Sequence, residues 1–359
     1  MAKKYQGSPS RTVDNGWDLE RRTGATYEIV SAEPPTQTNS AGIDQDGTDY
    51  SYFAQVHMGS ANTTLYMLLD SGASQSWVMG STCTSPACEV HNTFGPADSS
   101  TYKPTGGEFL LKYGSGNATG TYANDSVSLA GFTLEMTLGI ANVTSDDFLS
   151  FPIDGILGLA QGPSQQYPTF VETLVASKTF TSNLFAVILN RASDGNGDYG
   201  EISFGTTDPS KYTGSFSYTP ISPDAQGGWA IPMDSVGFGG KNAGISGKLA
   251  YIDTGTSFIF APQDEVAQFH QTVPGAQSTD GENWSVPCST TTPLTFTFSG
   301  VGWNVASQDW VGPMANGVCT SNVYGSEVVP GQWLLGDTFL KSVYTVFDID
   351  ENRIGKSRS

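Results

Sequence analysis

The 359-residue sequence has few cysteines and histidines, and it has no CxxC pair. Its three histidines and four cysteines therefore lack the spacing of a zinc site, and we expect no bound metal. The cysteines fall in two separated clusters of two. This even number favours two disulfides, which would pair Cys83 with Cys88 and Cys288 with Cys319.

Long apolar runs are also absent, so we expect no membrane span. The first residues have no apolar stretch behind them, and we expect that a signal peptide has been removed. Basic residues are scarce: 16 against 35 acidic ones, for a net charge of −19. Such a chain repels phosphate, so we expect neither nucleic acid nor an anionic membrane as a partner. The acidic composition suits a protein that works in acid, and it equally suits simple solubility.

Helical periodicity is rare, whereas glycine and short alternating apolar segments are frequent, which predicts an all-β fold with a few short helices. We expect strands at 52–56, 65–69, 108–113, 119–123, 126–130 and 132–143, and helices at 167–177 and 262–273. Three segments are expected: a basic N-terminal segment at 1–40, an N-terminal lobe at 41–212 and a C-terminal lobe at 213–359. Within the first segment, Pro34-Pro35 and the polar stretch to Ser40 fit a linker or an extended edge strand.

A short phrase occurs once in each half of the chain. Asp70 lies in Leu-Leu-Asp-Ser-Gly-Ala-Ser, and Asp253 lies in Tyr-Ile-Asp-Thr-Gly-Thr-Ser. If the two phrases face one another, their carboxylates cannot both ionise easily and they share a proton. One then acts as a base and the other as an acid, so the pair can activate water and protonate a leaving group without a metal or cofactor.

The residues around each aspartate have the properties that such a pair needs. Gly72 and Gly255 can offer backbone N–H groups at close range, and Thr256 can donate to a carboxylate oxygen. Hydroxyl groups can fix the loops by bonding the backbone, and these belong to Ser71, Ser74, Thr254 and Ser257. An isolated match of this kind is often only a turn between strands.

An apolar-Gly segment follows each phrase, in the same order in both halves. The first is Ile-Asp-Gly-Ile-Leu-Gly-Leu at 153–159, and the second is Trp-Leu-Leu-Gly-Asp at 333–337. Glycine at 158 and 336 would let one backbone pass close against another. Either segment alone fits an ordinary buried strand with a glycine bend, but the repeated order favours a duplicated half-site.

With these residues the chain, from about residue 50 to its end, resembles the pepsin family (A1) of aspartic endopeptidases, in particular the secreted fungal type. Asp70 and Asp253 match the two catalytic aspartates, and Trp77 matches the tryptophan that bonds the flap tyrosine. The flap, a hairpin that closes over substrate, matches Tyr113, Gly114 and Ser115, and Ile156 lies in the matching strand behind the first loop.

The resemblance implies a bilobal double β-barrel with pseudo-two-fold symmetry and a cleft between the lobes. It implies hydrolysis of extended polypeptides at acidic pH, hydrophobic residues beside the scissile bond, statine-type inhibitors and no cofactor. Both half-sites lie in one chain, so we expect a monomer. Five Asn-x-Ser/Thr sequons, with the paired cysteines, favour secretion or an acidic vacuolar compartment; they are at Asn62, Asn117, Asn124, Asn142 and Asn283.

Two features leave alternatives open. Residues 1–22, with five basic side chains and a dibasic Arg21-Arg22, fit the remnant of a propeptide or an incidental tail. Apolar residues near the flap fit either a substrate-binding wall or plain core packing; they are Tyr113, Phe148, Phe151, Ile153 and Ile156.

Ala73 departs from the family pattern because the second loop has Thr256 at the matching place. We expect the missing hydroxyl to shift the acidic limb of the pH profile toward neutral pH. Two other functions compete with this one: a non-catalytic binding protein on the same fold, and a glycoside hydrolase that uses two carboxylates. Intact aspartates and an intact Tyr113 argue against the first, and the paired repeat argues against the second.

Overall fold

The computed structural model describes residues 29–35, 37–114, 116–162, 166–194, 200–225, 228–315 and 317–358. Strands dominate these residues, and the helices are short, as predicted. The chain divides into two compact units. The first runs to Phe180 and also includes Ala192–Ile202, and the second contains Thr181–Arg191 and everything from Ser203 onward.

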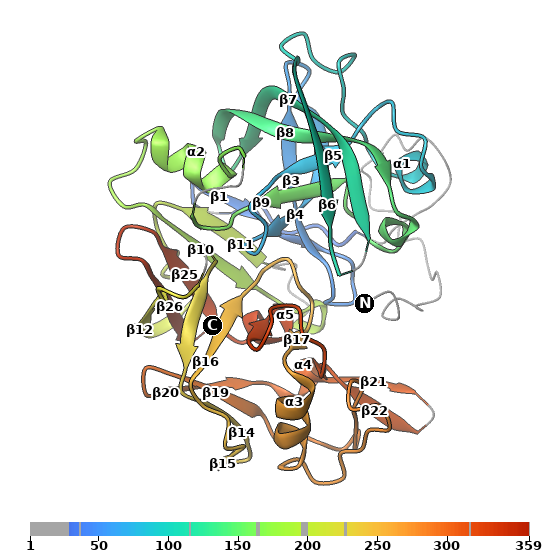
Figure 1. Cartoon of the computed structure of the whole chain (residues 1–359). Coiled ribbons are helices and arrows are strands. Elements are labelled where there is room, and N and C mark those ends of the chain that lie inside the picture. Colours follow the sequence, from blue (N-terminus) through green and yellow to red (C-terminus); the bar gives the residue numbers. More distant parts are fainter. Residues whose placement is uncertain are drawn as a thin grey trace. The chain divides into compact units, whose positions relative to one another are not determined.

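The first unit is built on a sheet of order β2-β3-β4-β9-β5-β8-β7-β6, with β3 also paired to β7 (Figure 1). The strands of the first unit are β1 (Ser40–Gly42), β2 (Asp44–Gln45), β3 (Tyr52–Met58), β4 (Thr63–Asp70), β5 (Trp77–Met79), β6 (Lys103–Lys112), β7 (Asn117–Leu129), β8 (Phe132–Thr144) and β9 (Gly155–Gly158). Its helices are α1 (Pro86–Val90), η1 (Asp146–Ser150), α2 (Phe170–Ala176) and η2 (Ala192–Asp194). Strand β11 (Gly200–Phe204) contains the boundary to the second unit.

One strand replaces the two predicted at 119–123 and 126–130. Strand β7 runs through Asn124 and Asp125 without a break because one oxygen of the buried Asp125 carboxylate, Oδ1, finds donors there, although Oδ2 has no hydrogen-bond partner among the described residues. The Thr101 hydroxyl and the Ser126 N–H both donate to its Oδ1, at 2.6 and 2.9 Å. A buried polar group with such donors is tolerated inside a strand, which composition alone does not reveal.

The helix predicted at 167–177 begins later, at Phe170, because Thr169 caps it. The Thr169 hydroxyl accepts from the Glu172 N–H, and the Glu172 carboxylate accepts from the Thr169 N–H. This reciprocal pair is a capping box, which fixes where a helix starts.

The second unit contains several smaller sheets, and a sheet of order β13-β16-β24-β17-β23 carries the second aspartate. Its strands are β10 (Leu184–Leu189), β12 (Thr213–Pro220), β13 (Ala230–Met233), β14 (Ser235–Phe238), β15 (Lys241–Asn242), β16 (Lys248–Ile252), β17 (Ile259–Phe260), β18 (Ser285–Val286), β19 (Leu294–Phe298), β20 (Val301–Val305), β21 (Val311–Ala315), β22 (Val318–Ser321), β23 (Val323–Tyr324), β24 (Trp333–Leu335), β25 (Tyr344–Asp348) and β26 (Arg353–Arg358). Its helices are α3 (Gln263–His270), α4 (Ser307–Trp310) and α5 (Asp337–Leu340). Helix α3 begins after Pro262, near the predicted start.

Each unit has a disulfide with the predicted pairing. Cys83–Cys88 closes the loop that carries α1, and Cys288–Cys319 ties the segment after β18 to β22. A cross-link of this kind restricts the unfolded chain and so stabilises the fold.

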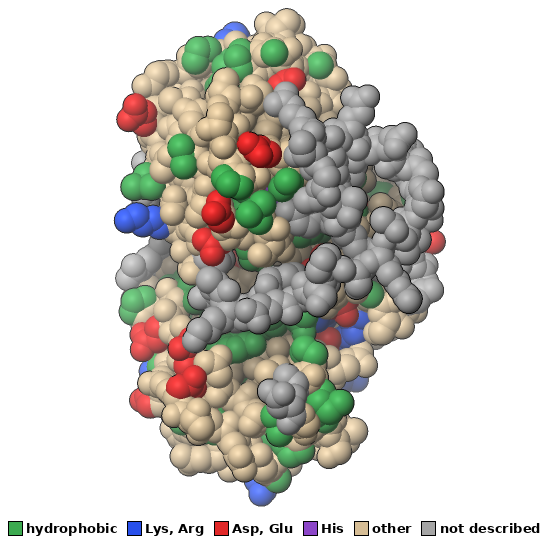
Figure 2. Space-filling view, turned by 90° about the vertical axis from the view of Figure 1, so that its right-hand side faces the viewer, with side chains coloured by type: hydrophobic (Ala, Val, Ile, Leu, Met, Phe, Trp, Pro, Cys, Tyr) green, Lys and Arg blue, Asp and Glu red, His purple; other side chains and the backbone are tan. Residues whose placement is uncertain are grey.

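Acidic side chains are spread over the face shown in Figure 2, as the net charge of −19 suggests. Among the described residues, no helix combines the length and the apolar character needed to cross a bilayer.

Lys356 is a buried cation in the core of the second unit. Its side chain is fully buried on β26, and Nζ lies 4.5 Å from the centre of the Phe298 ring. Among the described residues Nζ has no hydrogen-bond partner. Burial lowers the pKa of Lys356 to about 7. A folded-state pKa below the unfolded value means that the charge opposes folding most fully below about pH 7, and that this penalty fades as the pH rises.

We therefore expect Lys356→Met to stabilise the protein at acidic pH, because methionine fills similar space without a charge. The free energy of unfolding at about pH 5 should rise by roughly 3 kcal/mol, which urea unfolding would measure. The control is Lys241→Met at an exposed site on β15, where we expect a change within about 0.5 kcal/mol. Equal effects of the two substitutions would contradict this account of Lys356.

Candidate active site

The first aspartate stands at the end of β4, where the strand turns into a tight loop. Asp70 is 8% exposed, and its Oδ1 accepts the N–H of Gly72 at 2.8 Å. Its backbone oxygen accepts the N–H groups of Ala73 and Leu159, at 3.3 and 2.8 Å. The loop is thus hydrogen-bonded both within itself and to Leu159, directly after β9, and these bonds fix the direction of the carboxylate.

The second aspartate is held by the same bond in the second unit, with one addition. Asp253 is 7% exposed, and its Oδ1 accepts the N–H of Gly255 at 3.0 Å. Its Oδ2 also accepts the hydroxyl of Thr256 at 2.6 Å. At the matching place in the first loop, Ala73 has no hydroxyl to donate. The roles predicted for Gly72, Gly255 and Thr256 as donors therefore match these contacts.

The strands behind the two loops follow one pattern. In the first unit β4 pairs in parallel with β9, β9 antiparallel with β5, and β5 in parallel with β8. In the second unit β16, β24, β17 and β23 repeat this series of parallel, antiparallel and parallel pairs. The repeat detected in the sequence is therefore a repeat of topology in the two units.

Glycines 158 and 336 allow the close approach that this pattern requires. A Cβ atom on Gly158 would overlap the carbonyl oxygen of Ala73, and one on Gly336 would overlap that of Thr256. Any larger residue would push the aspartate loop off its backing strand.

Hydroxyl residues around the loops differ in burial. Ser71 and Thr254, each directly after an aspartate, are buried at 1% and 4% exposure. Ser74 and Ser257 are partly exposed, and the Ser257 carbonyl accepts both the N–H and the hydroxyl of Thr338. The sequence reasoning missed Ser76, whose Oγ accepts the N–H of Gly158 at 3.0 Å. A lone serine in a serine-rich chain gives no signal for this role.

The predicted flap is the hairpin of β6 and β7. The Tyr113 N–H donates to the Gly116 carbonyl at 2.9 Å, and the Trp77 Nε1–H donates to the Tyr113 hydroxyl at 2.7 Å. Burial and the charge of Asp70 raise the pKa of Tyr113 well above its ordinary value, so its hydroxyl keeps its proton. Gly114 is exposed, and Ser115 lies outside the described residues.

Of the apolar residues considered for a substrate wall, several are core residues of the first unit. Phe148, Ile153 and Ile156 are only 3%, 4% and 3% exposed. Ile156 lies opposite Leu68 of β4 and Trp77 of β5. Phe148 packs edge-on against Trp77, with ring centres 5.2 Å apart.

The five sequon asparagines are all exposed: Asn62, Asn117, Asn124, Asn142 and Asn283. The described part of the chain has no group of three or more His, Cys, Asp or Glu side chains placed to hold a metal ion. Residues 1–22 lie outside the described residues, so the propeptide hypothesis stays a prediction.

Two buried aspartates in matching loops, with a hairpin tyrosine near enough to the first to be affected by its charge, are typical of an aspartic-type endopeptidase. The family model of eukaryotic aspartyl proteases matches residues 51–359, and the chain belongs to this family. This confirms the resemblance drawn from the two loops and the flap.

Named relatives agree with this assignment. A probable aspartic-type endopeptidase CTSD of Trichophyton verrucosum is 41% identical over 355 residues, which cover 98% of this chain and 69% of that protein. The aspartic-type endopeptidase ctsD of Aspergillus fumigatus is 39% identical over 356 residues, or 97% of this chain and 75% of that protein. Cathepsin E of Aquarana catesbeiana is 33% identical over 319 residues, or 86% and 79%.

The difference between Ala73 and Thr256 should be visible in the pH dependence of catalysis. Ala73→Ser adds a donor near Asp70 like the one that Thr256 gives Asp253. A donor favours the ionised carboxylate, so the acidic limb of kcat/KM should move to lower pH, by about half a unit to one unit.

The reverse change, Thr256→Ala, is the matched control, and it should move the acidic limb to higher pH. Both profiles come from initial rates on one peptide over the acidic range. An acidic limb that stays in place in Ala73→Ser would contradict the role given to this position.

Proposed function

We propose that Asp70 and Asp253 together form the catalytic pair of this endopeptidase. The observation that carries the proposal is the backbone bond that the two carboxylates share, since each accepts the N–H of the glycine two residues later. Both are buried, which strengthens the interaction of each with any nearby charge. The cleft between the lobes, with lobe bounds at 41–212 and 213–359, is part of this proposal.

The chemistry follows from a proton shared by the two carboxylates. The ionised one takes a proton from a bound water, which attacks the peptide carbonyl, while the protonated one donates to the carbonyl oxygen. The carboxyl group that took the proton from water then donates it to the peptide nitrogen, the C–N bond breaks and the amine leaves, while the other carboxylate takes a proton from a hydroxyl of the intermediate. The Tyr113 hydroxyl, held by Trp77, belongs to a hairpin that can close over this reaction and exclude water.

A preference for hydrophobic residues beside the scissile bond is supported by Tyr113, a partly exposed aromatic side chain of the flap that packs on two buried aromatic residues. Tyr113, Trp77 and Phe148 are neighbours, with ring centres between 5.2 and 6.5 Å apart. An acidic pH optimum fits a shared proton, which requires that one carboxylate stays protonated.

We also propose secretion, or residence in an acidic vacuole-like compartment, as a glycosylated monomer. Two disulfides and five exposed sequon asparagines support this route. The proposed partners are peptide and protein substrates and statine-type inhibitors.

The deciding experiment is casein digestion at acidic pH with and without a statine-type inhibitor. We expect digestion, and we expect the inhibitor to abolish it. Asp70→Asn and Asp253→Asn should each lower kcat/KM on a peptide by about 10²–10⁴-fold, because either change removes half of the acid–base pair.

The control is Glu135→Gln, which removes an exposed carboxylate on β8 and should leave kcat/KM unchanged. Unimpaired cleavage by Asp253→Asn would exclude the proposed pair. Folded protein without any cleavage would favour the non-catalytic binding protein, and cleavage of a glycoside would favour the glycosidase.

A further inference from the structure

His91 lies between two backbone carbonyl groups in the interior of the first unit. Its Nδ1 is 2.7 Å from the Ala87 oxygen, and its Nε2 is 2.7 Å from the Phe151 oxygen. The residue is 5% exposed. A carbonyl oxygen only accepts hydrogen bonds, so both bonds form only when both ring nitrogens carry a proton, as in the imidazolium.

His270 in the second unit shows the contrasting arrangement. Its Nδ1 faces the Val266 carbonyl at 2.8 Å, whereas its Nε2 faces the Ser321 hydroxyl at 2.9 Å. A hydroxyl can donate, so a neutral ring satisfies both contacts. Burial lowers the pKa of His270 to about 4, in agreement with a neutral ring. The two buried histidines therefore differ in the number of protons that their partners require.

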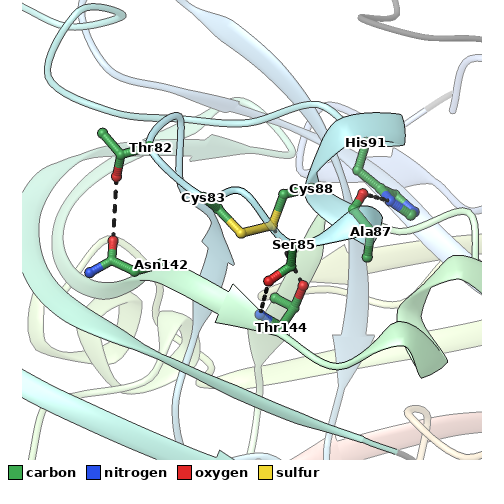
Figure 3. Close-up of a disulfide and its surroundings, with 8 residues drawn as sticks. All are labelled: Thr82, Cys83, Ser85, Ala87, Cys88, His91, Asn142 and Thr144. Atoms are coloured by element: carbon green, nitrogen blue, oxygen red, sulfur yellow. Dashed lines mark hydrogen bonds between the residues drawn. A yellow bond between two sulfur atoms is a disulfide. The ribbon is translucent and has the colours of Figure 1, made fainter.

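On one side His91 holds a part of the fold that is already anchored. Ala87 and Cys88 belong to α1, and the Cys83–Cys88 disulfide closes this loop (Figure 3). The Ser85 hydroxyl accepts the Thr144 N–H at 3.1 Å, which ties the start of α1 to β8.

On the other side His91 holds the segment that supports the flap. Phe151 follows η1, and its N–H donates to the Phe148 carbonyl at 3.3 Å. The Phe148 ring packs against Trp77 and, with ring centres 6.3 Å apart, against Tyr113. The bond from His91 to Phe151 thus fixes the segment whose aromatic ring packs against the hydrogen-bonded pair Trp77 and Tyr113.

Asp154, just before β9, lies close enough to His91 for their charges to interact wherever both groups are ionised. Its carboxylate accepts the N–H groups of Tyr66 and Asn92, both at 2.8 Å, and the Asn92 side chain at 3.0 Å. Burial raises the pKa of Asp154, while the Tyr66 N–H, the charge of His91 and Asn92 lower it. The other acidic groups on the packed elements are Glu89 on α1 and Asp146 and Asp147 on η1.

We propose that His91 is a positioning residue that, in its doubly protonated form, clamps η1 to α1 and so keeps Phe148, Trp77 and Tyr113 in place. The clamp is complete only while both ring nitrogens carry a proton, because a bare ring nitrogen would face a carbonyl oxygen. The first half-site thereby acquires a pH response of its own, in addition to that of the aspartates. This inference rests on the proposed role of Tyr113 as the flap residue.

Nuclear magnetic resonance of the ¹⁵N-labelled full-length protein tests the clamp without any assay of activity. At about pH 5 we expect protons on both ring nitrogens of His91 and on only one of His270. If one ring nitrogen of His91 carries no proton at about pH 5 in the folded parent protein, the proposal is overturned. This result does not depend on whether His91→Gln folds.

Substitution then tests the link to the flap. His91→Gln can donate only from its amide nitrogen, so we expect kcat/KM at acidic pH to fall about tenfold, as for a lost buried hydrogen bond. The parent's kcat/KM should fall over the pH range in which NMR shows His91 losing a proton. In the pH profile of His91→Gln this part of the fall should be absent.

The matched control is His57→Gln, because His57 is a partly exposed residue of β3 whose Nδ1 faces the Thr64 hydroxyl. It should keep the parent's pH profile. A parent-like profile in folded His91→Gln would also overturn the proposal. If the catalytic pair is wrong but the clamp is right, the parent enzyme should be inactive, while NMR still shows both protons on His91.

Discussion

A backbone N–H group two residues after each aspartate holds one carboxylate oxygen, and the rest of each half-site is arranged around this bond. Gly72 and Gly255 supply the two groups. The bond requires a tight loop, and the loop lies flat against the next strand only where that strand has a glycine. Gly158 and Gly336 meet this requirement in the two units. One local constraint therefore explains why the sequence repeats an Asp-x-Gly phrase and, later, an apolar-Gly step.

The repeated phrases made much of the site predictable. They predicted the donors Gly72, Gly255 and Thr256 and the close packing of Gly158 and Gly336, because each role follows from a residue type at a fixed place. The mostly β fold could be predicted for a similar reason, from short alternating segments with frequent glycine. Family membership then followed from the order of these motifs along the chain, and it is confirmed by the match over residues 51–359.

Other features could not be predicted because they depend on contacts between distant segments. The strand break expected near Asn124 is absent, since Asp125 finds a donor in Thr101. His91 looked like an isolated histidine, and only the positions of the Ala87 and Phe151 carbonyl groups show that it needs two protons. The surroundings of Lys356 were also not predictable, because its buried ammonium group lies against the ring of Phe298, which is far away along the chain, rather than against an acidic partner.

The central claim is that Asp70 and Asp253 hold one proton between them. Infrared difference spectra on binding of a statine-type inhibitor, with ¹³C-labelled aspartate, test this most directly. The account predicts one protonated-carboxyl band in the active pH range, and it predicts that this band disappears or shifts in both Asp70→Asn and Asp253→Asn. A band that responds to only one of the two substitutions would show that the carboxylates titrate independently, and it would contradict the account.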